Sequence, residues 1–501
     1  MAAMPHPSPR ATARALVLAA ALGAALAPAA RAEPIADPTP TTLPQALGAP
    51  ATATAFPATT APQNPFMATN PNNNLHNDTW MTDAYNRTGP LGTDLQASSG
   101  AMAPALCGSI AFDTKGRIVS VCPSITSPIT ARVIDPQTLA VRASYVLGAP
   151  NPTGPTAFQN FTGGGYFFLD KQDRIWSATK ASHLVVLAER DDATKLVKVA
   201  DYDLTGALKG DERVTSALPD FHGRIWFVSK KSGKVGILDT KTRKVGVLRT
   251  GEEIENSFAV DRDAIYIVSD EKMYRFSDRG GKPHVDWSVT YKNSGVHKPG
   301  QVDAGSGTTP TIMTGGYVAI ADNADPMDVV VYRTAAKLAR GAKRVVCTVP
   351  VFGKGAGATE NSLIGSGRAL IVEDNYGYQD PFGPRSGTVT TAGMARVDVN
   401  ADGRGCTRRW TTTDVQAPTV VPKLSTKTGL IYAYERVPAP TGEQPYFWTA
   451  VDARTGRTAF KRYAGSGLLF NNNYAGIALG PDGSAYLGVI GGIVRLRDGG
   501  S

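Results

Sequence analysis

The sequence predicts an all-β protein, a single β-propeller of four-stranded blades, with about eight blades and seven as the alternative count. Three observations carry this prediction. A hairpin pattern recurs about every 40–57 residues along the 501-residue chain, which is the spacing of propeller blades. A second hairpin follows the first in several repeats, and long helical periodicity is absent, which argues against a parallel α/β fold.

The first hairpin of each repeat joins a short apolar strand, a polar turn rich in Asp, Gly or Lys, and a second apolar strand. The copies cover residues 109–121, 166–177, 217–228, 258–268, 317–321, 363–372, 420–434 and 477–488. The second hairpin has its turn at Asp135–Thr138, Asp239–Thr242 and Asp452–Gly456. Two hairpins in each repeat make a four-stranded blade, and eight first hairpins imply eight blades.

One second hairpin, Val451–Phe460 with the sequence VDARTGRTAF, resembles the repeats of the quinoprotein-like (PQQ-like) eight-bladed propellers. This resemblance implies the propeller architecture over most of the chain. It does not establish an activity, because proteins of one fold can have many different functions. It also implies a quinone-dependent dehydrogenase as one function to consider. The lack of an adjacent Cys pair and the short chain count against that function.

The chain divides into three expected parts. Residues 1–32 read as a secretory signal peptide, with Arg10 and Arg14 before an apolar run and Ala30-Arg31-Ala32 as the cleavage site. Residues 33–64 are rich in Pro, Ala and Thr, which predicts a disordered linker, and residues 65–501 form the propeller. We therefore expect a secreted protein that does not span a membrane, and we expect it to be a monomer.

Charge excludes one class of partner. Removing residues 1–32 takes away three Arg and no acid, so the formal charge falls from +9 to +6. The remaining basic residues are scattered singly, without a Lys/Arg run interleaved with aromatic residues. Nucleic-acid binding is therefore not expected.

The four cysteines all lie in the part expected to be exported, where disulfides form readily. Cys107 and Cys122 flank the first hairpin and face each other across its strands, which predicts a disulfide between them. Cys347 and Cys406 fall in outer strands of neighbouring blades, and the sequence leaves their pairing open. No Cys-x-x-Cys motif supports a structural zinc site or a c-type haem.

Polar residues gather where propeller geometry brings strand ends together. The start of each first strand and the end of each second strand share one face, so residues at those places ring the mouth of the central channel. The candidate ligand-binding residues are Glu255, Asn256, Asp322, Asn323, Glu360, Asn361, Asp374, Asn375, Asn472 and Asn473. Their oxygens suit Ca²⁺ and suit sugar hydroxyls equally well. The alternative interpretation is that they cap strands and satisfy backbone groups of the inter-blade loops.

Glu255, Glu360 and Asn361 are the candidate ligands of a Ca²⁺ ion at the channel mouth. A second segment, Asp398–Gly403, matches the first half of a Ca²⁺-binding loop, but Arg409 stands where that loop needs Glu, so a hairpin turn is favoured. No Gly-x-Ser-x-Gly motif and no phosphate-binding loop is present.

Two function classes follow. The first is a secreted propeller that binds a small molecule or glycan at the channel mouth, with Ca²⁺ as a pin. The alternative is a metal-assisted lactonase or esterase in which the same carboxylates hold the metal and act as base. The sequence contains no residue that decides whether the protein is an enzyme.

Overall fold

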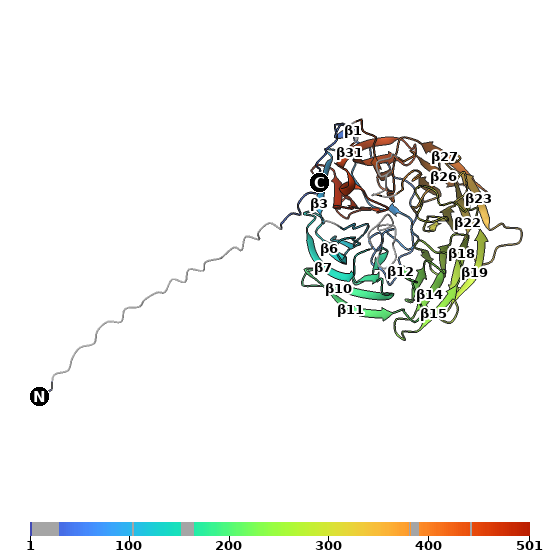
Figure 1. Cartoon of the computed structure of the whole chain (residues 1–501), viewed down its shortest axis with the longest axis horizontal. Coiled ribbons are helices and arrows are strands. Elements are labelled where there is room, and N and C mark those ends of the chain that lie inside the picture. The colour runs from blue at the N-terminus through green and yellow to red at the C-terminus, as the bar shows by residue number, and fades with distance from the viewer. Residues whose placement is uncertain are drawn as a thin grey trace. The chain divides into compact units, whose positions relative to one another are not determined.

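Eight antiparallel sheets stand around a central axis in the computed structural model of the chain (Figure 1). The structure describes residues 1–2, 30–102, 105–151, 165–379, 381, 390–440 and 443–500. Each blade contains four strands, which follow one another in chain order from the axis outwards. In the last blade the outermost strand is β3 (Gln96–Ala101), which comes from the beginning of the propeller. The sheet of β28–β31 (residues 423–466) carries two extra strands, β1 (Ala46–Gly48) and β2 (Ala84–Tyr85). The predicted all-β propeller with eight blades is confirmed over these residues.

In three of the first four consecutive blades the inner strand is short and the outer strands are longer, while the four strands of the third blade are of nearly equal length. Their strands are β4 (Ser109–Phe112), β5 (Ile118–Cys122), β6 (Ile129–Ile134) and β7 (Val141–Gly148); β8 (Phe167–Leu169), β9 (Ile175–Ala178), β10 (His183–Arg190) and β11 (Lys195–Asp203); β12 (Val214–Pro219), β13 (Ile225–Ser229), β14 (Lys234–Leu238) and β15 (Val245–Arg249); and β16 (Ala259–Asp261), β17 (Ala264–Val268), β18 (Lys272–Asp278) and β19 (Pro283–Thr290).

The next three blades repeat this order, and the eighth is completed from the other end of the chain. Their strands are β20 (Thr311–Met313), β21 (Tyr317–Ala321), β22 (Asp328–Arg333) and β23 (Val345–Pro350); β24 (Ile364–Ser366), β25 (Ala369–Glu373), β26 (Met394–Val399) and β27 (Cys406–Thr412); β28 (Lys423–Ser425), β29 (Leu430–Arg436), β30 (Pro445–Asp452) and β31 (Thr458–Ser466); and β32 (Ile477–Leu479), β33 (Ala485–Val489) and β34 (Gly492–Arg497). One short 3₁₀ helix, η1 (Leu468–Phe470), precedes β32.

An Asp at the end of the inner strand builds the first hairpin of several blades. In the blade of β4 and β5, the Asp113 carboxylate accepts hydrogen bonds from the backbone N–H groups of Lys115 and Arg117 and from Arg117 Nε. Asp170 and Asp220 use their Oδ1 atoms for the same kind of backbone contact. A short polar side chain that satisfies its own turn in this way explains why the repeat is legible in the sequence.

The ring closes by pairing the two ends of the propeller. β3 (Gln96–Ala101) adds to β34 as the outermost strand of the last blade, with Ser98 opposite Arg495. In Figure 1 the blue-cyan strand β3 therefore lies beside the red carboxyl end of the chain. This pairing supplies the fourth strand of the last blade from the amino-terminal part of the chain, so it holds the first and last blades together.

The segment 64–87, here called the plug, crosses the central channel, where Figure 1 shows its blue trace inside the ring. Its backbone carbonyls accept hydrogen bonds from the inner strands of six blades, and Asn64 and Arg87 donate side-chain hydrogen bonds to the other two. The contacts are Asn72 with Phe112, Asn73 with Leu169, Thr79 with Val260, Trp80 with Ile312, Thr82 with Gly365, Asp83 with Leu424, Asn64 with Pro219 and Arg87 with Leu479. The plug thus contacts all eight blades, and its strand β2 (Ala84–Tyr85) runs parallel to β28.

A buried ion pair anchors the plug. Lys423 in β28 pairs with Asp83, and neither side chain is exposed to solvent. The Lys423 ammonium also donates to the backbone carbonyl of Leu75, 2.8 Å away. A buried charge is tolerated only when it is paired and hydrogen-bonded, so this contact makes the position of the plug specific.

Residues 33–64, for which the sequence predicts a disordered linker, are placed against the ring in the structure. β1 (Ala46–Gly48) pairs with β31 at the outside of its blade. The Phe56 side chain is buried, and its backbone N–H donates to Thr426 O at 2.9 Å. This segment has too few large apolar residues to form a core of its own. Its backbone groups instead form hydrogen bonds with strands and loops of the blades.

Both cysteine pairs lie at disulfide-bonding distance. Cys107 and Cys122 have Cα atoms 4.2 Å apart, as the sequence predicts. Cys347 in β23 and Cys406 in β27 have Cα atoms 5.8 Å apart and join the outer strands of neighbouring blades. The sequence left the pairing of Cys347 with Cys406 open, and the structure places these two residues as a pair.

No helix within the described ranges is long and apolar enough to cross a membrane. The expected signal peptide falls almost wholly outside the described residues.

The anchoring role of Lys423 is testable. We expect Lys423→Met to lower the free energy of unfolding by about 3–5 kcal/mol, because it leaves the Asp83 carboxylate buried without its cation. Lys427→Met is the matched control, because Lys427 is exposed in the hairpin that follows the same strand. Urea unfolding followed by tryptophan fluorescence measures both. Equal, small losses in the two variants would contradict the anchoring role.

Candidate functional site

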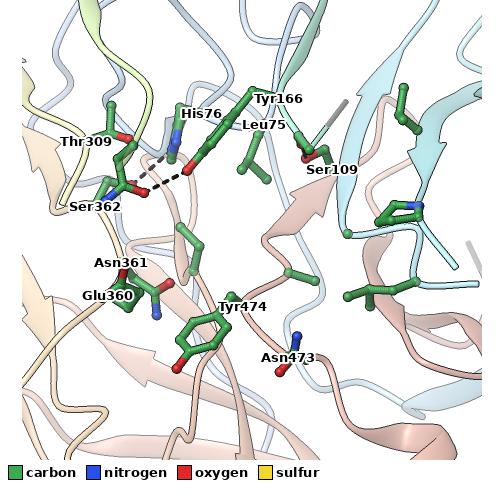
Figure 2. Close-up of a pocket in the computed structure, with 18 of the residues that line it drawn as sticks. Leu75, His76, Ser109, Tyr166, Thr309, Glu360, Asn361, Ser362, Asn473 and Tyr474 are labelled. Carbon is green, nitrogen blue, oxygen red and sulfur yellow. Dashed lines mark hydrogen bonds between the residues drawn. The ribbon is translucent and has the colours of Figure 1, made fainter. Parts of the chain in front are cut away.

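A cavity of about 50 Å³ lies at the end of the channel where the inner strands begin. Residues at or just before the inner strands of seven blades line it, and the plug contributes Leu75 and His76. The lining is Leu75, His76, Leu106, Gly108, Ser109, Val121, Pro123, Ile129, Asn151, Gly165, Tyr166, Asn256, Thr309, Glu360, Asn361, Ser362, Val421, Asn473, Tyr474 and Ala475. Figure 2 shows ten of these residues labelled, with Tyr166, His76 and Ser362 grouped together. The plug bonds to the inner strands farther along their length, so it closes the channel beneath this cavity.

His76 reaches the cavity from the plug and is held firmly on one side. Its Nδ1 lies 3.1 Å from each Asp83 oxygen and 3.0 Å from Ser362 Oγ, and Ser362 Oγ donates to Asp83 Oδ2 at 2.7 Å. Burial alone would raise the pKa of the Asp83 carboxyl, but Lys423 and His76 lower that pKa below its ordinary value. An ionised Asp83 only accepts hydrogen bonds, so Nδ1 carries a proton.

Glu360 contributes a buried carboxyl to the same cavity. Its Oε2 accepts a hydrogen bond of 3.0 Å from the Val302 N–H, and its Oε1 has no hydrogen-bond partner among the described residues. Burial raises the pKa of Glu360 to about 8; Asp303 adds to the rise, while Val302 and Lys230 oppose it. Near neutral pH this side chain is therefore mainly a neutral carboxylic acid that can donate a hydrogen bond.

Tyr166 and Asn256 form another wall of the cavity. The Tyr166 hydroxyl donates to Asn256 Oδ1 at 2.9 Å, and the Tyr166 ring stacks on His76 with centroids 6.4 Å apart. Burial raises the pKa of Tyr166 above its ordinary value, with Glu255 and Glu360 adding to the rise. The hydroxyl therefore stays protonated and orients the Asn256 amide.

Five of the fourteen non-glycine residues that have left-handed backbone conformations in the described part of the chain lie in the plug or at the cavity. Asn77, Met81 and Asp83 in the plug have φ between 53° and 61°, and Asn473 and Tyr474 have φ of 36° and 64°. Residues other than glycine adopt these values at a cost, and such strain concentrates at ligand-binding and active sites. Two of the five residues line the cavity themselves, and Asp83 positions His76.

The structure brings four of the ten predicted site residues to the cavity: Asn256, Glu360, Asn361 and Asn473. The sequence argument about shared strand ends therefore places these residues on one face. Whether they bind a ligand stays a prediction.

The other predicted site residues make local contacts. Asp322 Oδ1 accepts the N–H groups of Ala324 and Asp328, and Asp374 Oδ1 accepts those of Ala358 and Tyr376. Asn323, Asn375 and Asn472 also bond to neighbouring loop residues. These contacts match the alternative interpretation, strand capping.

Glu255 lies beside the cavity and pairs with a cation of the protein itself. Lys230 Nζ pairs with Glu255 and lies 2.8 Å from Asp303 Oδ2. Within the described ranges no group of three or more His, Cys, Asp or Glu is arranged to hold a metal ion. Lys230 thus lies between Glu255 and Asp303, and Ca²⁺ binding by Glu255, Glu360 and Asn361 stays a prediction.

The Asp398–Gly403 segment forms a hairpin turn between β26 and β27. The Asn400 N–H donates to Gly405 O, and Asp398 pairs with Arg396 and Arg409. The segment is therefore a hairpin turn, which is the interpretation that the sequence favoured.

Sequence reasoning missed His76, Asp83, Tyr166 and Thr309 as site residues. Tyr166 stands at an inner-strand start like the residues that were chosen, so the same positional rule could have found it. His76 and Asp83 belong to the plug, and the partners of Asp83, Ser362 and Lys423, are 279 and 340 residues away in sequence. No local pattern in the sequence signals such contacts.

Comparisons with known proteins support the fold and leave the activity open. No family model matches the chain. An uncharacterized protein of Archaeoglobus fulgidus is 24% identical over 483 residues, covering 86% of this chain and 90% of its own length. The quinohemoprotein alcohol dehydrogenase of Comamonas testosteroni has a TM-score of 0.53 at 13% identity, covering 87% of this chain and 81% of its own. The enzyme ADHIIG of Pseudomonas putida HK5 has a TM-score of 0.51 at 11% identity, covering 86% and 81%. The resemblance to the quinoprotein-like propellers is confirmed as a likeness of fold.

The buried carboxyls predict a pH-dependent stability. Burial raises the pKa of Glu360 and of Glu373 to about 8 from an ordinary value of 4.5. Between these pH values the folded protein keeps protons that the unfolded chain has lost, so the free energy of unfolding falls as the pH rises, by at most about 5 kcal/mol per carboxyl. Glu360→Gln should flatten this dependence, and Glu271→Gln, at an exposed position, should not. Urea unfolding from pH 4.5 to 8.5 measures it; a flat wild-type profile would contradict the shifted pKa values.

Proposed function

We propose that this protein binds a small, uncharged polar molecule, or the terminal unit of a glycan, in the cavity at the channel mouth. The observation that carries the proposal is a set of buried polar atoms at the lining that have no hydrogen-bond partner among the described residues: His76 Nε2, Asn256 Nδ2, Glu360 Oε1 and Asn361 Oδ1. Buried polar groups are nearly always paired, so a cluster of unpaired ones marks the place of water or a ligand.

The apolar residues of the lining favour a ligand with an apolar side. Leu106, Val121, Ile129 and Val421 line the cavity together with Pro123. An apolar surface with a few convergent polar groups is the usual composition of a small-molecule site. The combination suits a ring or short chain that carries hydroxyl or carbonyl oxygen on one edge.

The charge of the lining argues for a neutral ligand. No Lys or Arg belongs to the described lining, and its one carboxyl, Glu360, is mainly protonated near neutral pH. The tricarboxylate quinone PQQ, which the fold family implies, would need cationic partners that this lining does not offer. The residues therefore do not fit that cofactor, and we assign no quinone chemistry to the cavity.

Hydrolysis of a lactone or ester is the second candidate function. Two proton-transfer groups, His76 and Glu360, line one cavity, which is the arrangement that acid–base chemistry needs. The proposal includes action outside the cell, supported by the two cysteine pairs at disulfide-bonding distance. Ca²⁺ as a pin remains a proposal that the binding experiment also addresses.

Thermal unfolding of the protein tests ligand binding. The probes are glucose, N-acetylglucosamine, glycerol, γ-butyrolactone and its lactam analogue 2-pyrrolidinone, each with and without 5 mM CaCl₂, against a matched ionic-strength control. We expect at least one organic probe to raise Tm, because a ligand bound only to the folded state stabilises it by mass action. Glu360→Gln should reduce that shift, and Glu271→Gln should leave it unchanged.

Each arm has a distinct outcome. A Tm rise with CaCl₂ alone that Glu360→Gln abolishes would support the calcium pin, and no rise would contradict it. If no organic probe shifts Tm, small-molecule binding at this cavity is contradicted for the classes that the panel represents.

A further inference from the structure

We propose that His76 is the general base of a metal-free hydrolytic site in this cavity, oriented by Asp83, and that Glu360 supplies the proton to the leaving oxygen of a small neutral lactone or ester. This inference rests on the proposed function, because it requires the cavity to hold the substrate. It replaces the metal that the lactonase alternative invoked with two side chains of the protein.

The hydrogen bonds of His76 set its tautomer. Asp83 is ionised beside Lys423 and accepts from Nδ1, while Ser362 Oγ already donates its proton to Asp83. Nδ1 must therefore be the nitrogen that carries the proton in the neutral ring. The remaining nitrogen, Nε2, then has a free lone pair, which is the state that a general base requires.

The position of His76 makes its Nε2 lone pair available to a molecule in the cavity. The residue is only 3% exposed, it lines the cavity, and its Nε2 has no hydrogen-bond partner among the described residues. A histidine that served only to pack the plug would be expected to satisfy both ring nitrogens. Here one nitrogen is fixed by a carboxylate, a hydroxyl contact and a stacked tyrosine, and the other is left for a molecule in the cavity.

Glu360 fits the complementary role. Its Oε1 is buried and unpartnered, and Oε2 is fixed by the Val302 N–H. The charged groups that act on it are Asp303 and Lys230, with Glu255 nearby and paired to the same lysine. A base and a neutral acid in one site form the pairing that lets one active site both accept and donate a proton.

The proposed reaction conserves atoms and charge. Water attacks the carbonyl carbon as His76 Nε2 accepts one of its protons, and a C–O bond forms. The tetrahedral intermediate collapses, the bond to the leaving oxygen breaks, and Glu360 gives its proton to that oxygen. The products are a carboxylic acid and a hydroxyl group, which belong to one molecule when the substrate is a lactone. The proton on His76 returns to Glu360 through solvent.

The test is hydrolysis of γ-butyrolactone, δ-valerolactone and p-nitrophenyl acetate by the full-length protein and its variants. We expect His76→Gln to lower kcat/KM by at least about 100-fold, the usual contribution of a general base. The control is His222→Gln, because His222 lies in the turn between β12 and β13, at the opposite end of the inner strands. Glu360→Gln should also lower kcat, and wild-type activity should decline as the pH rises through about 8, where Glu360 loses its proton.

Further readouts separate the possible failures. Nitrogen-15 NMR of the histidine rings should show His76 protonated at Nδ1 only, and Asp83→Asn should change that pattern. If His76→Gln does not fold, Glu360→Gln and the NMR spectrum carry the test. A Tm shift with 2-pyrrolidinone but no hydrolysis of any probe would overturn this inference and leave the binding function standing. Hydrolysis that His76→Gln leaves unchanged would overturn the role of His76.

Discussion

The backbone hydrogen bonds between the plug and the inner strands are the interaction on which the rest of the structure depends. Inner strands are the edges of their sheets, and an edge strand carries unpaired N–H and C=O groups. Six of the eight inner strands donate an N–H to a carbonyl of residues 72–83. The same segment carries His76 and Asp83, so satisfying the edges also delivers the polar groups of the candidate site. The hydrogen bonds that stabilise the ring therefore also build the cavity.

Specific side chains then fix the position of the plug in the central channel. Backbone pairing alone tolerates a shift of register, because one carbonyl is much like the next. The ion pair of Asp83 with Lys423 joins two buried charges, and a shift of the plug would separate them. Ser362 on β24's leading loop adds a contact to the same carboxylate. Together they place His76 with the accuracy that an oriented nitrogen requires.

The ring could be predicted from sequence because its signals are local. Asp113 and Arg117 are four residues apart and build one turn, so each repeat is visible in a short window. Strand direction then placed Asn256, Glu360, Asn361 and Asn473 at one end of the channel. The plug carries no such period. His76 lies 286 residues from Ser362 in sequence, and the Pro/Ala/Thr-rich stretch before the plug gains its order from blades formed elsewhere in the chain. The composition of a segment indicates whether it can form a hydrophobic core of its own. It does not indicate whether the segment can pack against a core that other segments form.

The pairing of β3 with β34 carries a consequence for biosynthesis. The plug and β3 precede the strands of all eight blades that follow in the chain, and β34 comes after the other strands, so this pairing can form only after every blade has been synthesised. A nascent chain stopped at any earlier blade can form hairpins but cannot enclose residues 64–87. The environment of His76 and Glu360 therefore forms only after β34 has been made. A product that ends before β34 lacks the closed ring around the cavity.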